Sequence, residues 1–287
     1  MSRSTDQEKI RILHALIIDL HLKVIKMLLV FLYYALPILL EPYPISSSGH
    51  VALLQQILSK INGIMVPEIP SYYEYLLHGP IALVVLVFFG RSWLQIVTTS
   101  SMSQIKTMFF AGFMADLLTV LVYGFFSVVG MSIFPLWLGF FVTACLLFSL
   151  LLCKIEIIEQ PFTMRSGAVL GIAQGIALLP GISRFGTTFV VARWLGYSEQ
   201  KACIFSFLIE WPISIAGFFK GAVTMYQMQG DHSEVLNLSI GLVILIAMFG
   251  AYGGFYIIKQ IIKQKKIWLF GYYVLFLSIL SLMLNFF

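Results

Sequence analysis

Two short polar stretches decide the fold of this chain: Pro44-Ile45-Ser46-Ser47-Ser48-Gly49-His50 and Pro180-Gly181-Ile182-Ser183-Arg184-Phe185-Gly186. Each one interrupts a long apolar region, residues 24–58 and 166–197. Ionisable and polar groups at membrane depth are costly unless they are partnered, so they indicate a functional site. The apolar arm on either side of each stretch is only about 10 to 17 residues long, which suits a re-entrant hairpin better than two full spans.

The chain as a whole has the composition of a membrane protein. Of its 287 residues, 60% are hydrophobic and 11% are charged, and the mean hydropathy is +0.94. A soluble domain carries about 25% charged residues. The net charge of +5 comes mostly from lysines and arginines at the ends of apolar segments, where they set topology. Because no basic and aromatic stripe accompanies this charge, we expect no nucleic-acid partner.

Further apolar runs are long enough to cross about 30 Å of hydrocarbon. They cover residues 75–95, 107–128, 134–153, 203–223, 236–258 and 267–287. Three runs follow each broken region, a pattern typical of an internal repeat with binding near the membrane midplane. We therefore predict an all-α polytopic membrane protein with about six transmembrane helices and two re-entrant helical hairpins in an inverted repeat.

The repeat also predicts the domain organisation and the orientation. Residues 1–22 are interpreted as an N-terminal extension and 23–287 as one membrane domain, with repeat halves of about 23–153 and 166–287. The loops richest in lysine and arginine all fall on one side of the membrane, the inside, if the two hairpins enter from opposite sides. The polar loops can then meet near the centre, and we expect the site to open to the outer side. The basic residues of the extension, which would lie outside, do not fit this orientation.

The polar loops carry groups that suit phosphate. Gly49, Gly181 and Gly186 let the backbone approach a ligand closely. Arg184 has a planar fork that matches phosphate oxygens. Hydroxyl donors come from Ser46, Ser47, Ser48, Ser183, Thr187 and Thr188. Each loop is also expected to lie at a helix N-terminus, which favours anions.

Two more residues can carry the chemistry. Glu41 can hold a divalent cation or take a proton, and His50 can move a proton or attack phosphorus. The polar residues of the two loops also have purely structural explanations. The serines can cap helices, and Glu41 can simply neutralise Arg184. We favour a functional site because both loops are polar at once.

These residues resemble the motifs of the undecaprenyl-diphosphatase family, integral membrane phosphatases of bacterial cell-wall lipid recycling. The family's first motif has a Glu, two residues and then P-[IV]-S-S-[ST]-G-H, which resembles residues 41–50. The second has A-Q, a short spacer and P-G-x-S-R-S-G-x-T, which resembles residues 173–188. A third stretch, F-S-F-L followed by Pro, resembles residues 205–212. The resemblance runs from about residue 23 to the end of the chain.

The resemblance implies hydrolysis of undecaprenyl diphosphate, a polyprenyl diphosphate, to the monophosphate carrier lipid and phosphate. It further implies a divalent cation, Mg²⁺ or Ca²⁺, a bacterial inner (cytoplasmic) membrane location, and links to peptidoglycan synthesis and bacitracin resistance. The implied catalytic residues are Glu41, Ser47, His50 and Arg184, with Ser47 or His50 as nucleophile or its activator. The implied substrate-binding residues are Ser46, Ser48, Gly49, Gln174, Gly181, Ser183, Gly186 and Thr188.

The chain departs from the family pattern at two positions. Pro37 occupies the place, four residues before the matched Glu41, where the family usually has Glu or Gln. Phe185 occupies the place of a Ser. Because Pro37 supplies no carboxylate, Glu41 is the main metal candidate of the first motif. Glu74, which shares a helix face with His78, is a second candidate. Two other carboxylates in apolar segments, Asp116 and Glu210, are interpreted as residues of segment edges or polar pockets.

Two other functions stay open. A lipid-phosphate transporter or flippase can use the same anion site, and the loss of a carboxylate at Pro37 favours it. A catalytically weakened homologue is the other alternative. The Ser47-x-x-His50 pair favours the enzyme, because transport needs no nucleophile. The expected partners are the polyprenyl diphosphate and the bilayer, and self-association as a homodimer is left open.

Overall fold

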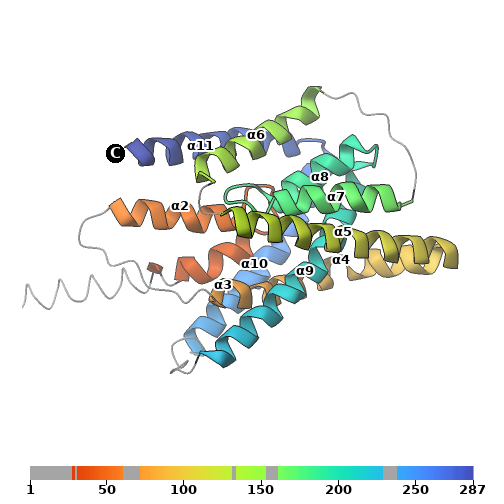
Figure 1. Cartoon of the computed structure of the whole chain (residues 1–287), viewed down its shortest axis with the longest axis horizontal. Helices are drawn as coiled ribbons and strands as arrows, with labels where there is room; N and C mark the ends of the chain where they lie inside the picture. Colours follow the sequence, from red (N-terminus) through yellow and green to blue (C-terminus); the bar gives the residue numbers. More distant parts are fainter. Residues whose placement is uncertain are drawn as a thin grey trace, which may run out of the picture.

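The chain forms a bundle of α-helices (Figure 1). The structure is a computed structural model that describes residues 28–29, 31–60, 72–130, 134–152, 161–228 and 238–286. Within these ranges it contains no strand, so the prediction of an all-α protein is confirmed. The predicted extension, residues 1–22, lies outside the described residues.

The helices follow the predicted apolar runs. A helix at Phe31–Leu40 precedes α2 (Ser47–Lys60), α3 (Tyr72–Leu76), α4 (His78–Thr99), α5 (Met102–Val129), α6 (Leu136–Leu152), α7 (Met164–Ile176), α8 (Arg184–Trp194), α9 (Glu199–Gln227), α10 (Leu238–Lys263), a 3₁₀ turn (Ile267–Leu269) and α11 (Phe270–Phe286). Among the described residues, 5 helical stretches are long and apolar enough to cross a membrane. They are α3 with α4, α5, α9, α10, and the 3₁₀ turn with α11. The remaining predicted span corresponds to α6, whose described residues, Leu136–Leu152, form an apolar helix of 17 residues.

Each broken region folds as a helix, a loop and a second helix. In Figure 1 the first hairpin, which ends in α2, reaches the middle of the molecule from one end, and the α7–α8 hairpin reaches it from the opposite end. The loops meet there, because the side chains of Glu41 and Arg184 are in contact. This is the arrangement expected of an inverted repeat. The path of the hairpins relative to a bilayer stays a prediction.

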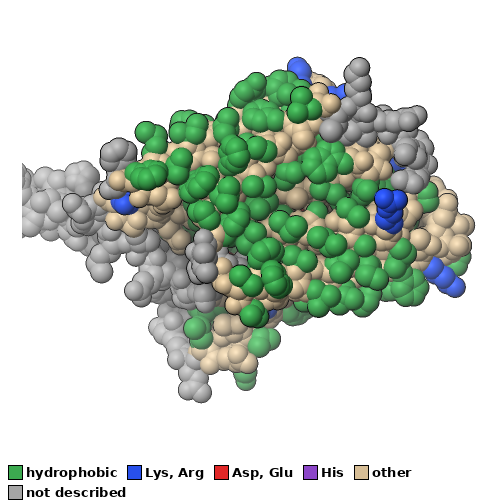
Figure 2. Space-filling view, turned by 45° about the horizontal axis from the view of Figure 1, so that its top comes forward, with side chains coloured by type: hydrophobic (Ala, Val, Ile, Leu, Met, Phe, Trp, Pro, Cys, Tyr) green, Lys and Arg blue, Asp and Glu red, His purple; other side chains and the backbone are tan. Residues whose placement is uncertain are grey.

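Much of the surface is apolar, as lipid contact requires. Large side chains along α5 are exposed, for example Phe109, Phe113 and Phe125. Figure 2 shows a face dominated by hydrophobic side chains, with lysine and arginine toward its margins. Patches this extensive mark contact with a membrane or another protein. Together with the apolar helices, they identify a multi-pass membrane protein.

The tightest helix packing joins α5 to α7 and predicts a stability effect. A Cβ atom at Gly171 would lie 2.3 Å from the carbonyl oxygen of Ala115, so alanine there must push the two helices apart. We expect Gly171→Ala to destabilise the protein by about 1–3 kcal/mol. Thermal unfolding in detergent measures the change. Gly112→Ala on α5, with no atom within 4 Å of its Cβ position, is the matched control and should be neutral or stabilising. Equal losses for both variants would contradict this explanation.

Candidate active site

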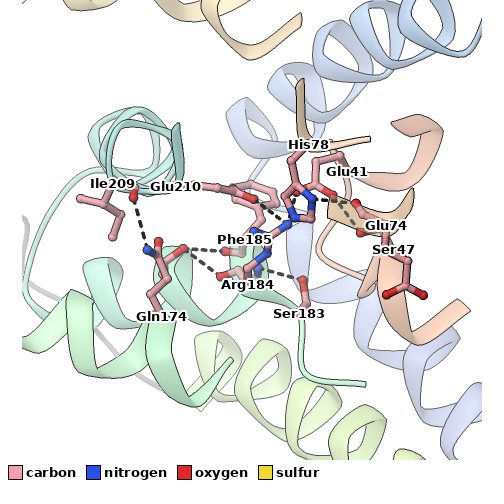
Figure 3. Close-up of polar contacts among 12 residues, drawn as sticks. Glu41, Ser47, Glu74, His78, Gln174, Ser183, Arg184, Phe185, Ile209 and Glu210 are labelled. Atoms are coloured by element: carbon pink, nitrogen blue, oxygen red, sulfur yellow. Dashed lines mark hydrogen bonds and ion pairs between the residues drawn. The ribbon is translucent and has the colours of Figure 1, made fainter. Parts of the chain in front are cut away.

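Side chains from both hairpins converge on one carboxylate, that of Glu41 (Figure 3). The Arg184 Nη2 atom donates a hydrogen bond of 2.8 Å to Glu41 Oε1, across 143 residues of sequence. The Ser47 hydroxyl donates to Glu41 Oε2, also at 2.8 Å. Glu41 is only 7% exposed, so little water screens either contact. The three residues therefore form one partly buried, charge-assisted network around the buried carboxylate.

The first loop is shaped by Ser46 and Gly49. Ser46 has φ of 64°, a left-handed conformation that non-glycine residues seldom adopt. Its hydroxyl accepts a hydrogen bond from the Gly49 backbone N–H at 3.2 Å and thereby caps the start of α2. A Cβ atom at Gly49 would lie 2.9 Å from the Phe140 ring, so the close packing of α2 on α6 requires glycine. This loop places Ser47 and Ser48 in the first turn of α2.

The second loop is fixed against α6. Gly181 has φ of 82°, and a Cβ atom there would lie 2.6 Å from the Leu136 carbonyl oxygen. The Thr143 hydroxyl donates to the Gly181 carbonyl at 3.2 Å and accepts from the Ser183 backbone N–H at 3.0 Å. The Ser183 hydroxyl accepts from the Gly186 N–H at 3.1 Å and caps α8. Arg184 is therefore the first residue of a well-anchored helix.

The two loops also touch through Gly186. A Cβ atom at this glycine would lie 3.3 Å from Cβ of Pro44, in the first loop. A larger residue at position 186 would press the two loops apart. The predicted role of Gly186 as a close-approach residue thus has a structural counterpart, although the approach seen is of protein to protein.

A second carboxylate, Glu210 of α9, contacts the same end of the arginine. Its Oε1 atom is 3.3 Å from Arg184 Nη2, the same nitrogen that contacts Glu41. Glu210 is 3% exposed. The sequence alone does not predict this contact with Arg184, because it indicates only a residue of a segment edge or a polar pocket. The signal was its place in the middle of an apolar span, where an ionisable side chain indicates function.

Three cavities meet at the serine loop and Arg184. The smallest, of about 20 Å³, is lined by Glu41, Ser46, Ser47, Ser48, Ser183 and Arg184 together with apolar neighbours. Two larger cavities, of about 110 and 520 Å³, both have Ser48 and Arg184 in their walls. The largest extends to Lys220, whose Nζ donates to the Tyr75 hydroxyl at 3.0 Å. Space for a phosphate therefore exists next to the predicted residues.

His50 points away from this centre. One ring nitrogen, Nδ1, lies 2.8 Å from the Ser46 carbonyl oxygen, and Nε2 lies 2.9 Å from the Tyr273 hydroxyl of α11. The ring stacks on Tyr273, and His50 is not among the residues lining the three cavities. Its contacts are those of a positioned imidazole that ties α2 to α11, and its catalytic role stays a prediction.

Two predicted substrate-binding residues use their polar groups within the protein. Gln174 Nε2 donates to the Thr119 hydroxyl at 3.3 Å and to the Ile209 carbonyl at 3.2 Å. The Thr188 hydroxyl donates to the Arg184 carbonyl at 2.9 Å. Both are almost completely buried. These bonds hold α7 to α5 and α9 and stiffen the first turn of α8. The two residues therefore position the helices of the site and do not line its cavities.

The two departures from the family pattern have different surroundings. Phe185 is 3% exposed and its ring stacks on Phe207 with centroids 4.7 Å apart, so it belongs to the aromatic core. Pro37 lines the 110 Å³ cavity together with Glu41 and Arg184. An acidic side chain at position 37 would thus face the same space.

The metal candidates can also be located. Glu74 is exposed; it and His78 line both larger cavities, and the His78 ring hydrogen-bonds the Glu74 backbone carbonyl at 2.9 Å. No group of three His, Cys, Asp or Glu side chains close enough to hold a metal occurs within the described ranges. Glu41 and Glu210 still fit a divalent cation, because Mg²⁺ often binds through one or two carboxylates plus substrate phosphates.

Comparison with known proteins agrees with these features. The sequence model of the family described as bacitracin resistance protein BacA matches residues 38–280. The undecaprenyl-diphosphatase of Thermotoga sp. (strain RQ2) is 31% identical over 255 residues, 85% of this chain and 94% of the relative. That of Borrelia recurrentis (strain A1) is 28% identical over 259 residues, 84% of this chain and 92% of the relative. With both polar loops inside the matched region, the chain belongs to the BacA bacitracin resistance protein family.

Proposed function

We propose that this protein hydrolyses undecaprenyl diphosphate, or a closely related polyprenyl diphosphate, to the lipid monophosphate and phosphate. One observation carries the proposal: the Ser47 hydroxyl and the Arg184 guanidinium both bind the buried Glu41 carboxylate at 2.8 Å, beside cavities that reach apolar helices. A nucleophile in contact with a base, next to a phosphate-binding cation, suits phosphoryl transfer. The named activity of the family members supports the same reaction.

The geometry supports a reaction that begins at Ser47. Glu41 accepts the proton of the Ser47 hydroxyl as the oxygen attacks the terminal phosphorus. The new bond joins Ser47 Oγ to phosphorus, and the bond from that phosphorus to the bridging oxygen breaks, releasing the lipid monophosphate. Water then attacks the phosphoserine, the bond from Ser47 Oγ to phosphorus breaks to free phosphate, and the proton held by Glu41 returns to Oγ. Arg184 stabilises the charge on the phosphoryl oxygens throughout.

The reaction also requires neutralisation of a highly charged diphosphate. A bound Mg²⁺ or Ca²⁺ would supply this charge and polarise the phosphoryl oxygens. Glu41 is the residue proposed to hold it, with Glu74 a weaker candidate because its side chain is exposed. Arg184, the N-terminus of α8 and the serine hydroxyls would orient the phosphates from the protein side.

The cellular setting is proposed from the same features. The apolar helices support residence in a membrane, and we propose the bacterial inner membrane, where such carrier lipids are used. The prenyl chain would lie between apolar helices and enter the bilayer. Assembly as a homodimer stays a prediction, which cross-linking in native membranes can check.

The first test is phosphate release by the detergent-purified protein from undecaprenyl diphosphate with Mg²⁺, with and without EDTA. We expect release by the wild type, its loss with EDTA, and a decrease of about 10²-fold or more in Glu41→Gln, because the general base is removed. Glu199→Gln is the matched control, since Glu199 pairs with Arg193, 3.1 Å away and outside the site. The activity of its folded fraction should stay near that of the wild type. A folded wild type that binds the lipid but releases no phosphate would contradict the proposal and favour the carrier or weakened homologue.

A further inference from the structure

The Glu210 carboxylate is an unusual group for its position. It lies in the middle of α9, a 29-residue apolar helix, and only 4% of its side chain is exposed. A carboxylate in a membrane-protein interior is costly and is retained where it binds a partner, an ion or a substrate. The neighbouring turns of α9 are small or apolar, with Ser206, Ile209 and Ser214 buried around it. Glu210 therefore requires an explanation beyond packing.

Arg184 alone does not provide this explanation. Glu41 and Glu210 both contact the same guanidinium nitrogen, at 2.8 and 3.3 Å. With both carboxyl groups ionised, the pair and the one arginine carry a formal charge of −1, from two negative charges and one positive. In addition, the buried Glu210 Oε1 atom accepts no hydrogen bond among the described residues, and its contact with Arg184 Nη2 is an ion pair at 3.3 Å. Buried polar atoms are nearly always satisfied, so this oxygen is suited to bind an ion or to carry a proton.

The chemistry of the pair selects the ligand. Carboxylate oxygens are the donors that hard divalent cations prefer, and a cation bound by two carboxylates has sites left for phosphate oxygens. A divalent cation would offset the charge of the two ionised carboxylates and coordinate the Glu210 oxygen that accepts no hydrogen bond. The position lies beside Ser47, which bonds the other oxygen of Glu41. A cation here would thus be within the proposed reaction centre.

We propose that Glu41 and Glu210 together form the divalent-cation site of this protein, and that the α9 carboxylate replaces the acidic residue that position 37 lacks. The catalytic role of this cation rests on the proposed function, whereas the location of its site rests on the structure. Pro37 and Glu41 line the same cavity, with Arg184 in its wall. A carboxylate at position 37 would therefore face a cavity that reaches Arg184, the residue that Glu210 contacts from α9. The site keeps two carboxylates and one guanidinium, but draws them from three different helical segments.

Arg184 then has two roles. Without substrate it lies between the carboxylates and balances one of their charges. When a diphosphate arrives, its fork has a better anionic partner in the phosphoryl oxygens. Glu41 and Glu210 bind a cation without substrate, and movement of the guanidinium onto phosphate strengthens that binding because their oxygens no longer share Arg184. Glu210 is in this sense a metal ligand that also positions Arg184.

Mn²⁺ binding to the full-length protein in detergent, measured by electron paramagnetic resonance without lipid, tests the site directly. We expect Glu210→Gln, which keeps the shape of the side chain, to weaken Mn²⁺ binding about tenfold or more. Glu199→Gln removes a carboxylate from the same helix outside the site and should bind Mn²⁺ like the wild type. The double variant Pro37→Glu with Glu210→Gln should recover most of the lost affinity.

Two results would overturn the inference: no Mn²⁺ binding by the wild type, or equal binding by the wild type and Glu210→Gln. Gel filtration and thermal unfolding of each variant separate a lost site from a lost fold. Because the assay contains no lipid, its outcome is independent of phosphate release. A protein that binds Mn²⁺ through Glu210 but hydrolyses no diphosphate would keep the site and reject the proposed function.

Discussion

Replacing Arg184 with alanine is expected to lower kcat/KM for phosphate release by about 10³-fold or more. The guanidinium is the only cationic side chain that lines all three cavities of the described site. Transition states of phosphoryl transfer are stabilised mainly by positioning and charge, so its loss should affect kcat more than KM. Steady-state kinetics on the purified variant measure the effect. Retention of more than a tenth of the activity would contradict this role.

Two further variants show what the Arg184 guanidinium contributes: one keeps its charge, and the other removes a different arginine of the same helix. Arg184→Lys keeps the positive charge but loses the bidentate geometry, and we expect activity between that of the wild type and the alanine variant. Arg193→Ala removes another buried arginine of α8, which pairs with Glu199 and hydrogen-bonds the Tyr197 carbonyl. It should lower stability, because it breaks a partly buried pair. The activity of its folded fraction should stay near that of the wild type.

Replacing Ser47 with alanine is expected to reduce turnover by about 10³-fold or more, because the nucleophile itself is removed. The serine hydroxyl is held by the carboxylate that would take its proton, at 2.8 Å. Rapid acid quench followed by mass spectrometry should find phosphate on the peptide containing Ser47 in the wild type, and none in Ser47→Ala.

Replacing His50 is expected to lower activity less than replacing Ser47. Its ring nitrogens contact the Ser46 carbonyl and the Tyr273 hydroxyl, so His50→Gln should act through the shape of the loop. We expect a smaller loss than for Ser47→Ala, with Tyr273→Phe producing part of it. Phosphate trapped on His50, or a larger loss in His50→Gln than in Ser47→Ala, would make the histidine the nucleophile.

Hydropathy was sufficient to predict which segments are helical but not where each helix ends. The span predicted at 203–223 belongs to α9, which runs from Glu199 to Gln227. The run predicted at 75–95 is divided at Leu77 into α3 and α4. A hydropathy pattern detects the apolar part of a helix, whereas its ends depend on caps such as the Ser198 hydroxyl, which accepts from the Lys201 N–H at 3.4 Å.

The residues of the site could likewise be predicted only in part from the sequence. Glu41, Ser47 and Arg184 could be predicted because both loops are polar where the chain is otherwise apolar. Their convergence on one another followed from the inverted repeat. The role of Glu210 was missed because it depends on which face of α9 turns toward Arg184, and a sequence pattern does not contain that rotation. The same holds for His50 and Gln174, whose partners, Tyr273 and Ile209, come from other helices.

The contact between Glu41 and Arg184, which spans 143 residues, has a consequence for biosynthesis. A ribosome adds roughly 5–20 residues per second, so the arginine is made roughly 7–30 s after the carboxylate that it binds. The glutamate on α9 follows later still. A nascent chain with only its first hairpin inserted therefore holds a serine loop without its cationic partner. Enzymatic competence should arise late, in one step, when the second half of the polypeptide enters the membrane.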